Sequence, residues 1–348
     1  MWGRWGNTWA WRAIAAATLL APSASAQDLA ADQEAFQAYL PTLRARALSH
    51  GVRLQTVEAV LADLELHPRV LELDRNQPGG GASGPISPFR PYRAQHVDAA
   101  RIGRGRAAWA AQRPRLAAIE RETGVPESIA VAIWGHETDY GANAGGFDQP
   151  RALSTLAYDG RRRALFEAEF VASLQMLDRG VPRWQLKGSW AGATGGPQFL
   201  PSVYLRVARD GDGDGRADIW SSAADTLASI GGYLADAGWR PGVPWGFAVS
   251  VPPTLDRGWL RTRLVSPRCP RVFERQSAWR SVAEWRALGL TPVDRPWPSD
   301  GVLATLVEPD GPGAPGFLLT GNYRVILDYN CSTNYALSVG VLADAVER

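Results

Sequence analysis

The stretch "PESIAVAIWGHETDYG", residues 126–141, decides the fold, because it ends an apolar run on a single glutamate and then turns at a glycine. If residues 126–137 form one helix, apolar side chains surround nearly its whole circumference, which is typical of a helix buried in a domain core. Pro126 stands at the first turn, where a missing N–H costs nothing. The sequence therefore predicts a central helix that ends at Glu137.

Glu137 has the profile of a general acid, because burial disfavours the charged carboxylate and raises its pKa. The alternative is an ordinary glutamate, exposed where the helix reaches the surface, and this stretch alone does not separate the two. His136 and Asp139 leave the helix in other directions, so neither is a convincing partner for Glu137. A glycosidase normally needs a second carboxylate, but substrate-assisted cleavage uses an acetamido group of the sugar instead.

Helical periodicity continues on both sides of this stretch. Residues 32–73 predict two helices separated by Gly51, and residues 76–92, rich in glycine and proline, predict a long loop. Further helices are predicted around residues 101–123, 162–177 and 222–239, with a glycine-rich turn at residues 187–202. These patterns favour a mainly α fold.

The sequence pattern changes after Pro252. Short runs of mixed helical and strand character, with scattered prolines, predict a small α+β portion. Residues 316–320 and 323–329 read as strands, and residues 334–346 as a closing helix. We therefore divide the chain into a core with N-terminal helices at residues 27–250 and a small α+β portion at residues 251–348, whose closing helix completes the active site.

Residues 1–26 have the pattern of a cleaved export signal. Arg4 and Arg12 flank a Trp-rich start, an apolar run follows, and "ASA" at residues 24–26 fits a cleavage site before Gln27. The alternative, a membrane anchor, is weak because the apolar run is shorter than the roughly 20 residues that span a bilayer. No cysteine follows the run, which excludes a lipid-modified N-terminus. We expect a soluble periplasmic protein without a membrane anchor.

Charge and cysteine content narrow the function further. Removing Arg4 and Arg12 with the signal leaves 35 basic against 35 acidic residues, so nothing indicates nucleic-acid binding. Cys269 and Cys331 are the only cysteines, and neither has a second metal ligand at a suitable spacing. In an exported chain a disulfide is the better interpretation. Two separately buried thiols are the alternative.

Five motifs, in order, carry a resemblance to a known family: "AIWGHETDYG" (132–141), "LSTLAYDGRRR" (153–163), "KGSWAGATGGPQFLPSVY" (187–204), "DGDGDGRADIWSSAADTLASIGGYLADAGW" (210–239) and "YRVILDYNCSTNYALSVGVLAD" (323–344). Across nearly all of the mature chain it resembles the lytic murein transglycosylases of the membrane-bound B type. The resemblance implies a lysozyme-like, mainly α (α+β) core that requires no cofactor. It also implies cleavage of the MurNAc-β-1,4-GlcNAc bond of peptidoglycan without water, to give 1,6-anhydro-MurNAc ends.

The resemblance also implies roles for particular residues. Glu137 would be the single acid/base, and Ser189 would orient the N-acetyl group of the sugar. The remaining substrate-binding positions are Gln198, Tyr233, Tyr329 and Asn330. The chain departs from the family at Gly195-Gly196-Pro197, where a polar side chain is common, and at His136, where an apolar residue is usual. Two rival functions are a hydrolytic muramidase that uses the same acid with water, and a catalytically inactive peptidoglycan-binding scaffold.

Residues 210–221, "DGDGDGRADIWS", follow the spacing of a calcium-binding loop. The acids at positions 1, 3, 5 and 9 are Asp210, Asp212, Asp214 and Asp218. Position 12 is Ser221, which cannot supply the bidentate carboxylate, but Asp225 stands further along. This indicates a structural calcium site. The alternative is a tight acidic turn whose aspartates bond the backbone.

Overall fold

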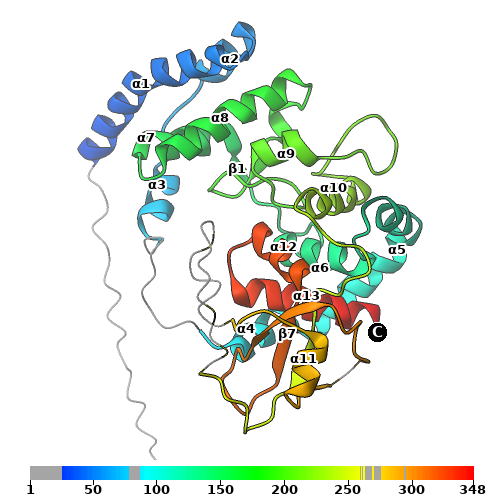
Figure 1. Cartoon of the computed structure of the whole chain (residues 1–348). Helices are drawn as coiled ribbons and strands as arrows, with labels where there is room; N and C mark the ends of the chain where they lie inside the picture. The colour runs from blue at the N-terminus through cyan, green and yellow to red at the C-terminus, as the bar shows by residue number, and fades with distance from the viewer. Residues whose placement is uncertain are drawn as a thin grey trace, which may run out of the picture.

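The computed structural model describes residues 26–77, 87–258, 260, 262, 269, 276–293 and 295–348. The predicted export signal lies almost wholly outside these residues. Helices dominate the fold, and a small sheet lies at one end of it (Figure 1). The mainly α (α+β) prediction is confirmed. Among the described residues, no helix is both long and apolar enough to cross a membrane.

The first helices pack against the middle of the chain rather than standing apart. Helices α1 (Ala26–Ser49), α2 (Leu54–Leu61) and α3 (Pro68–Arg75) share one apolar cluster with α7 (Gln149–Asp159) and α8 (Arg163–Asp178). Gly51, with φ of +80°, separates α1 from α2 as predicted. The third helix, which begins at Pro68, was not expected from the pattern.

A second cluster surrounds α6 (Glu127–Thr138), the predicted central helix. Every side chain from Ser128 to Trp134 is buried. Figure 1 shows this helix in the middle of the fold, among α5 (Ala99–Thr123), α10 (Ala223–Asp236), α12 (Gly321–Tyr329) and α13 (Thr333–Glu347). Burial on all sides explains why its sequence is apolar around the whole circumference.

The C-terminal portion contains an antiparallel sheet with the strand order β4-β6-β7-β3-β5. Its strands are β3 (Gly246–Ser250), β4 (Arg280–Ser281), β5 (Thr291–Pro292), β6 (Leu303–Val307) and β7 (Gly316–Leu319). Helix α11 (Val282–Ala287) covers it, and Trp285 is fully buried in a third apolar cluster. The smaller elements elsewhere are α4 (Phe89–His96), β1 (Phe147–Asp148), the 3₁₀ turn at Arg183–Gln185, β2 (Lys187–Gly188) and α9 (Pro201–Val207).

Two of the secondary-structure predictions made from the sequence are wrong. Residues 323–329, predicted as a strand, form most of α12, whose Val325, Ile326 and Leu327 are buried. The predicted loop at residues 76–92 ends earlier than expected, because α4 begins at Phe89. The strand at β7 and the closing helix α13 are confirmed. The division of the chain near residue 250 stays a prediction.

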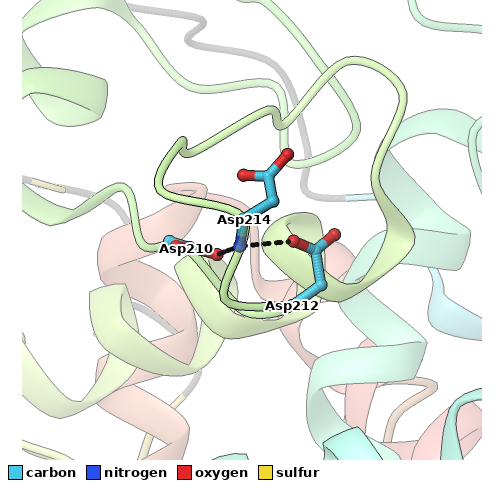
Figure 2. Close-up of side chains that lie close together, drawn as sticks. All are labelled: Asp210, Asp212 and Asp214. Atoms are coloured by element: carbon cyan, nitrogen blue, oxygen red, sulfur yellow. Dashed lines mark hydrogen bonds between the residues drawn. The ribbon is translucent and has the colours of Figure 1, made fainter.

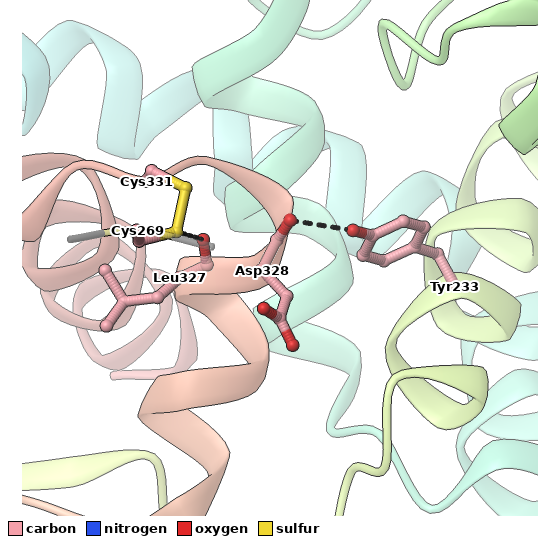
Figure 3. Close-up of a disulfide and its surroundings, with 5 residues drawn as sticks. All are labelled: Tyr233, Cys269, Leu327, Asp328 and Cys331. Atoms are coloured by element: carbon pink, nitrogen blue, oxygen red, sulfur yellow. Dashed lines mark hydrogen bonds between the residues drawn. A yellow bond between two sulfur atoms is a disulfide. The ribbon is translucent and has the colours of Figure 1, made fainter. Parts of the chain in front are cut away.

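The disulfide between Cys269 and Cys331 is confirmed, with 5.3 Å between the Cα atoms (Figure 3). The alternative of two separate thiols is therefore wrong. Cys331 lies in the short connection between α12 and α13. The bond thus fixes that connection to a segment 62 residues earlier in the chain.

Candidate active site

The site begins where α6 stops. Asp139, Tyr140 and Gly141 follow the helix with φ of +51°, +60° and +91°, a left-handed run that ends it at once. The N–H of Asp139 still bonds the Gly135 carbonyl at 3.1 Å. Non-glycine residues rarely adopt this conformation. The turn therefore needs support from contacts elsewhere in the fold.

Gly135 and Tyr140 supply that support. A Cβ on Gly135 would lie 2.5 Å from the Tyr140 ring, so only glycine lets the ring fold back against the helix. The Tyr140 hydroxyl donates a hydrogen bond to the Arg101 carbonyl of α5 at 3.0 Å. The end of α6 is consequently fixed, and Glu137 with it.

Glu137 is a half-buried carboxyl group held by a tyrosine. The Tyr335 hydroxyl donates a hydrogen bond to Glu137 Oε1 at 2.5 Å. Burial raises the pKa of Glu137 from 4.5 to about 7, and the Tyr335 bond opposes this by favouring the carboxylate. The group can thus give up and take back a proton near neutral pH.

Tyr335 is the residue of this site that sequence reasoning missed. It is buried in the first turn of α13, where Ser332 caps the helix by accepting the Tyr335 N–H at 3.2 Å. Burial, and then the nearby Glu137 charge, raise the pKa of Tyr335 well above 10, so it stays a donor. The signal was present in the last motif, as a tyrosine three residues after a helix-capping serine.

The two titratable residues closest to Glu137 in the sequence, His136 and Asp139, contact other side chains. Asp139 is ion-paired with Arg104, with 2.8 Å between Oδ1 and Nη2. The His136 ring lies 6.1 Å from the His96 ring and 5.6 Å from the Tyr335 ring. Burial lowers the pKa of His136 to about 3, so the imidazole is neutral. Neither side chain resembles the second carboxylate of a hydrolase.

Ser189, the predicted ligand of the acetamido group, follows a short two-stranded pairing. Strand β2, just before it, pairs antiparallel with β1, which follows the turn after α6. Gly145 makes this possible, because a Cβ there would lie 2.3 Å from the Gly188 carbonyl oxygen. The Ser189 hydroxyl oxygen accepts the Ala193 N–H at 3.1 Å. Its own proton is left for another acceptor.

The glycine-rich loop, residues 187–202, is hydrogen-bonded directly to the end of α6. The Thr138 hydroxyl donates to the Gly196 carbonyl at 3.0 Å. Gln198 has a φ of +52°, and its amide nitrogen donates to the Ala144 and Gly195 carbonyls, each at 3.1 Å. The backbone carbonyls of Gly195 and Gly196 are therefore hydrogen-bond acceptors in this loop.

Aromatic side chains form another part of the site. Tyr233 and Tyr329 pack edge to face with 4.7 Å between ring centroids, and both lie near Phe199. The Tyr329 hydroxyl donates to the Pro197 carbonyl at 2.6 Å, and the Tyr233 hydroxyl to the Asp328 carbonyl at 2.8 Å (Figure 3). Asn330 is exposed at the end of α12. The loop thus links α6, α10 and α12 in one place.

In the acidic loop, residues 210–221, three of the five predicted calcium ligands lie close together. Asp210, Asp212 and Asp214 each offer an oxygen within 4.8 Å of the others' (Figure 2). Asp210 also accepts the N–H groups of Gly213 and Gly215. Clustered, exposed carboxylate oxygens fit a hard cation such as calcium.

The other two predicted ligands bond the backbone. Asp218 accepts the N–H groups of Trp220 and Ser221. Asp225 is fully buried and accepts those of Gly211 and Asp218. These bonds belong to the tight acidic turn that was the alternative to calcium. Both features are present in one loop, and the backbone bonds give the carboxylate cluster its shape.

Comparison with known proteins agrees with this geometry. The transglycosylase SLT domain family matches residues 35–344. Membrane-bound lytic murein transglycosylase B of Escherichia coli K12 is 30% identical over 303 residues, which are 85% of this chain and 79% of that protein. The resemblance inferred from the sequence is confirmed.

Solved structures give the same result. SltB3 of Pseudomonas aeruginosa, in complex with NAG-anhNAM-pentapeptide, matches with a TM-score of 0.79 and 36% identity over 90% of this chain and 79% of that one. The Escherichia coli lytic transglycosylase SLT35, in complex with calcium, matches with a TM-score of 0.71 and 28% identity over 90% of this chain and 93% of that one.

Proposed function

The chain belongs to the transglycosylase SLT domain family, and on that premise we propose that it cleaves the MurNAc-β-1,4-GlcNAc bond of peptidoglycan without adding water. Glu137 acts as the only acid/base, and the product ends in 1,6-anhydro-MurNAc. The observation that carries this proposal is the pKa of about 7 that burial gives Glu137, beside a tyrosine and with no partner carboxylate bonded to it in the described part of the chain.

In the first step Glu137 is protonated and gives its proton to the glycosidic oxygen. The C1–O4 bond breaks, GlcNAc leaves with its O4 hydroxyl restored, and positive charge develops at C1 of MurNAc. The carbonyl oxygen of the 2-acetamido group stabilises that charge, as in substrate-assisted glycosidases. Tyr335 bonds the carboxylate that remains, which favours proton release.

In the second step the Glu137 carboxylate accepts the proton of the C6 hydroxyl. O6 then forms the bond to C1, which closes the 1,6-anhydro ring and returns Glu137 to its starting state. The atoms balance without water. Glu137 gives one proton to the GlcNAc product and recovers one from the C6 hydroxyl of MurNAc. A pKa near the working pH suits a group that acts in both directions.

We assign the remaining positions to substrate binding. Ser189 has a hydroxyl proton available to orient the acetamido group. The amide of Gln198, on the loop tied to α6, contacts a sugar. We place half-buried Tyr329, and the buried Tyr233 that packs on it, beside the cleaved bond, and exposed Asn330 is a neighbour of that site. Sugar rings stack on aromatic side chains through their apolar faces.

The rival functions are disfavoured by particular observations. A hydrolytic muramidase would need a group to activate water, and Asp139, the nearest acid in sequence, is paired with Arg104. An inactive scaffold has no use for a half-buried acid that titrates near neutral pH, because such shifted pKa values are typical of functional sites.

We also propose that the acidic loop binds calcium as a structural ion, with Asp210, Asp212 and Asp214 as ligands. The ion would offset the repulsion between three neighbouring carboxylates and hold the loop against α10. Catalysis needs no cofactor in this mechanism.

Export to the periplasm with removal of residues 1–26 is a further part of the proposal. It rests on the signal pattern and on the disulfide, which persists in oxidising compartments. N-terminal sequencing of the protein recovered from cells tests it, with Gln27 as the expected first residue.

The product of peptidoglycan digestion tests the activity itself. Purified sacculi are incubated with the protein, and the released muropeptides are analysed by mass spectrometry. Lytic cleavage gives anhydro products that are one water lighter than those of a muramidase. Reducing, hydrated ends would assign the chain to the muramidases, and no release at all would favour the scaffold.

A further inference from the structure

A cavity of about 510 Å³ lies outside the site described above, in the range of volumes typical of small-ligand sites. It lies where β6 ends and α4 begins, with Leu306 and Glu308 on one side and Pro88 on the other. None of the residues in the proposed mechanism lines it.

The strongest feature of this cavity is Gln276. The residue is 5% exposed and lines the cavity, and within the described part of the chain neither its amide nitrogen nor its amide oxygen has a hydrogen-bond partner. Leaving a buried amide unpaired destabilises a protein, so such groups are rare without a function. An amide presents a donor and an acceptor side by side. The complementary ligand group is another amide, such as a peptide group.

Charged groups beside Gln276 indicate a second property of the ligand. Arg257 and Glu308 form a two-bond ion pair, at 2.6 and 2.9 Å. Asp310 also lines the cavity and accepts the Arg90 N–H at 2.8 Å. Among the described residues of the lining, the Arg257–Glu308 pair is neutral and Asp310 adds one negative charge, which favours a ligand with a cationic group.

The cavity is also connected to the active site. Helix α4 runs from the cavity to His96, whose ring stacks on His136, next to Glu137. Asn334, beside Tyr335 on α13, donates to the Ser87 carbonyl at 3.2 Å. An eight-residue helix is about 12 Å long. The His96 and His136 rings add 6.1 Å to this path, which makes about 18 Å, and an extended five-residue peptide spans about 17 Å, so the two lengths are comparable.

We propose that this cavity binds the peptide carried by the MurNAc residue of the substrate. Gln276 pairs with a peptide group, and the charge of Asp310 attracts a free side-chain amine. This inference rests on the proposed function, since it assumes a glycan in the cleft next to α6. It assigns the chain a preference for peptide-bearing over bare glycan.

The test compares two ligands on Glu137→Gln protein, and neither ligand is turned over because neither contains a MurNAc-β-1,4-GlcNAc bond. These are NAG-NAM-pentapeptide with a free side-chain amine and the same disaccharide without peptide, titrated by calorimetry. We expect the peptide to tighten binding about tenfold, the value of two net hydrogen bonds. Adding Gln276→Met should remove that gain and leave the affinity for the bare disaccharide unchanged.

Two controls separate binding from folding and from catalysis. Gln276→Met removes unpaired amide atoms, so its melting temperature should equal or exceed that of the parent, and a lower one together with weaker binding of both ligands overturns the assignment. Acetylating the ligand amine should weaken binding. Equal affinity for both ligands, or a peptide gain that survives Gln276→Met, also overturns it. Failure of the proposed function would appear separately, as wild-type protein that releases no anhydro-muropeptides.

Discussion

Glu137 is placed where two influences on its pKa oppose each other. Burial at the end of α6 raises the pKa, and the hydrogen bond from Tyr335 lowers it. Burial is the larger effect, and the result is a pKa of about 7. A fully exposed carboxyl, with a pKa near 4.5, would already have lost its proton at neutral pH, and a fully apolar pocket would keep it from releasing the proton.

The first prediction concerns turnover. Glu137→Gln keeps the shape of the side chain but cannot exchange a proton, so anhydro-muropeptide release should fall by about 10²- to 10⁴-fold. The measurement is product release from sacculi, with circular dichroism to confirm folding. Asp139→Asn is the matched control, and it should cost little because it changes only a half-exposed pair with Arg104. Near-normal activity of Glu137→Gln, or loss of activity in Asp139→Asn, contradicts the assignment.

The same pKa predicts a pH dependence of stability. The folded protein holds the Glu137 proton more tightly than the unfolded chain, whose pKa is 4.5. The stabilising contribution is therefore fully present below about pH 4.5 and is lost as the pH rises through about 7. Relative to wild type, Glu137→Gln should gain up to about 3 kcal/mol between pH 5 and pH 8. Denaturant unfolding at both pH values measures the gain, and an unchanged difference would exclude the shifted pKa.

Tyr335 gives the next prediction. Its hydroxyl favours the Glu137 carboxylate, so Tyr335→Phe should raise the pKa of Glu137 further. Activity should then fall at a higher pH on the alkaline side of the pH–rate profile. The maximal rate should also be lower. Tyr323→Phe is the control, because this buried tyrosine also bonds a neighbour, the Thr333 carbonyl, without touching Glu137. An unmoved profile in Tyr335→Phe would show that the bond is only structural.

At the scale of elements, the sequence predicted the central helix α6, but it predicted only some of the helices that pack against α6. Apolar residues around the whole circumference identified α6, because burial on all sides demands that pattern. The apolar run of α12 was misread as a strand, since a short run without clear periodicity fits either element. Thr320 decides for the helix by capping it, with its hydroxyl oxygen accepting the Asn322 N–H at 3.1 Å.

The acidic loop carries the prediction that belongs to this scale. If the carboxylates of Asp210, Asp212 and Asp214 bind calcium, millimolar calcium should raise the melting temperature by several degrees, because only the folded loop gathers them. Asp212→Ala with Asp214→Ala should abolish the shift. Differential scanning fluorimetry of metal-stripped protein measures it. Magnesium serves as the control ion, and no response of the wild type to calcium would leave only a hydrogen-bonded turn.

At the scale of the whole molecule, the proposed active site is assembled from segments far apart in the chain. Glu137 comes from α6, the bonded carbonyls from the loop before α9, Tyr233 from α10, and Tyr329 and Tyr335 from the last two helices. Sequence motifs predicted which segments contribute residues to the site, and the structure brings Tyr329 and Tyr233 into ring contact. They could not predict the Tyr335 bond to Glu137, because it depends on how α13 packs against α6.

The disulfide holds this assembly together, and it gives the last prediction. Cys269 and Cys331 are 62 residues apart, so the bond removes about 4 kcal/mol of chain entropy from the unfolded state. Cys269→Ser with Cys331→Ser should therefore lower the melting temperature by about 10 °C. Tyr329 lies two residues before Cys331, so the double variant should also lose activity before it unfolds, as the end of α12 loosens. The reducing agent alone should reproduce both effects in wild type and neither in the variant. Equal melting temperatures in all samples would mean that packing of α12 against α13 suffices without the bond.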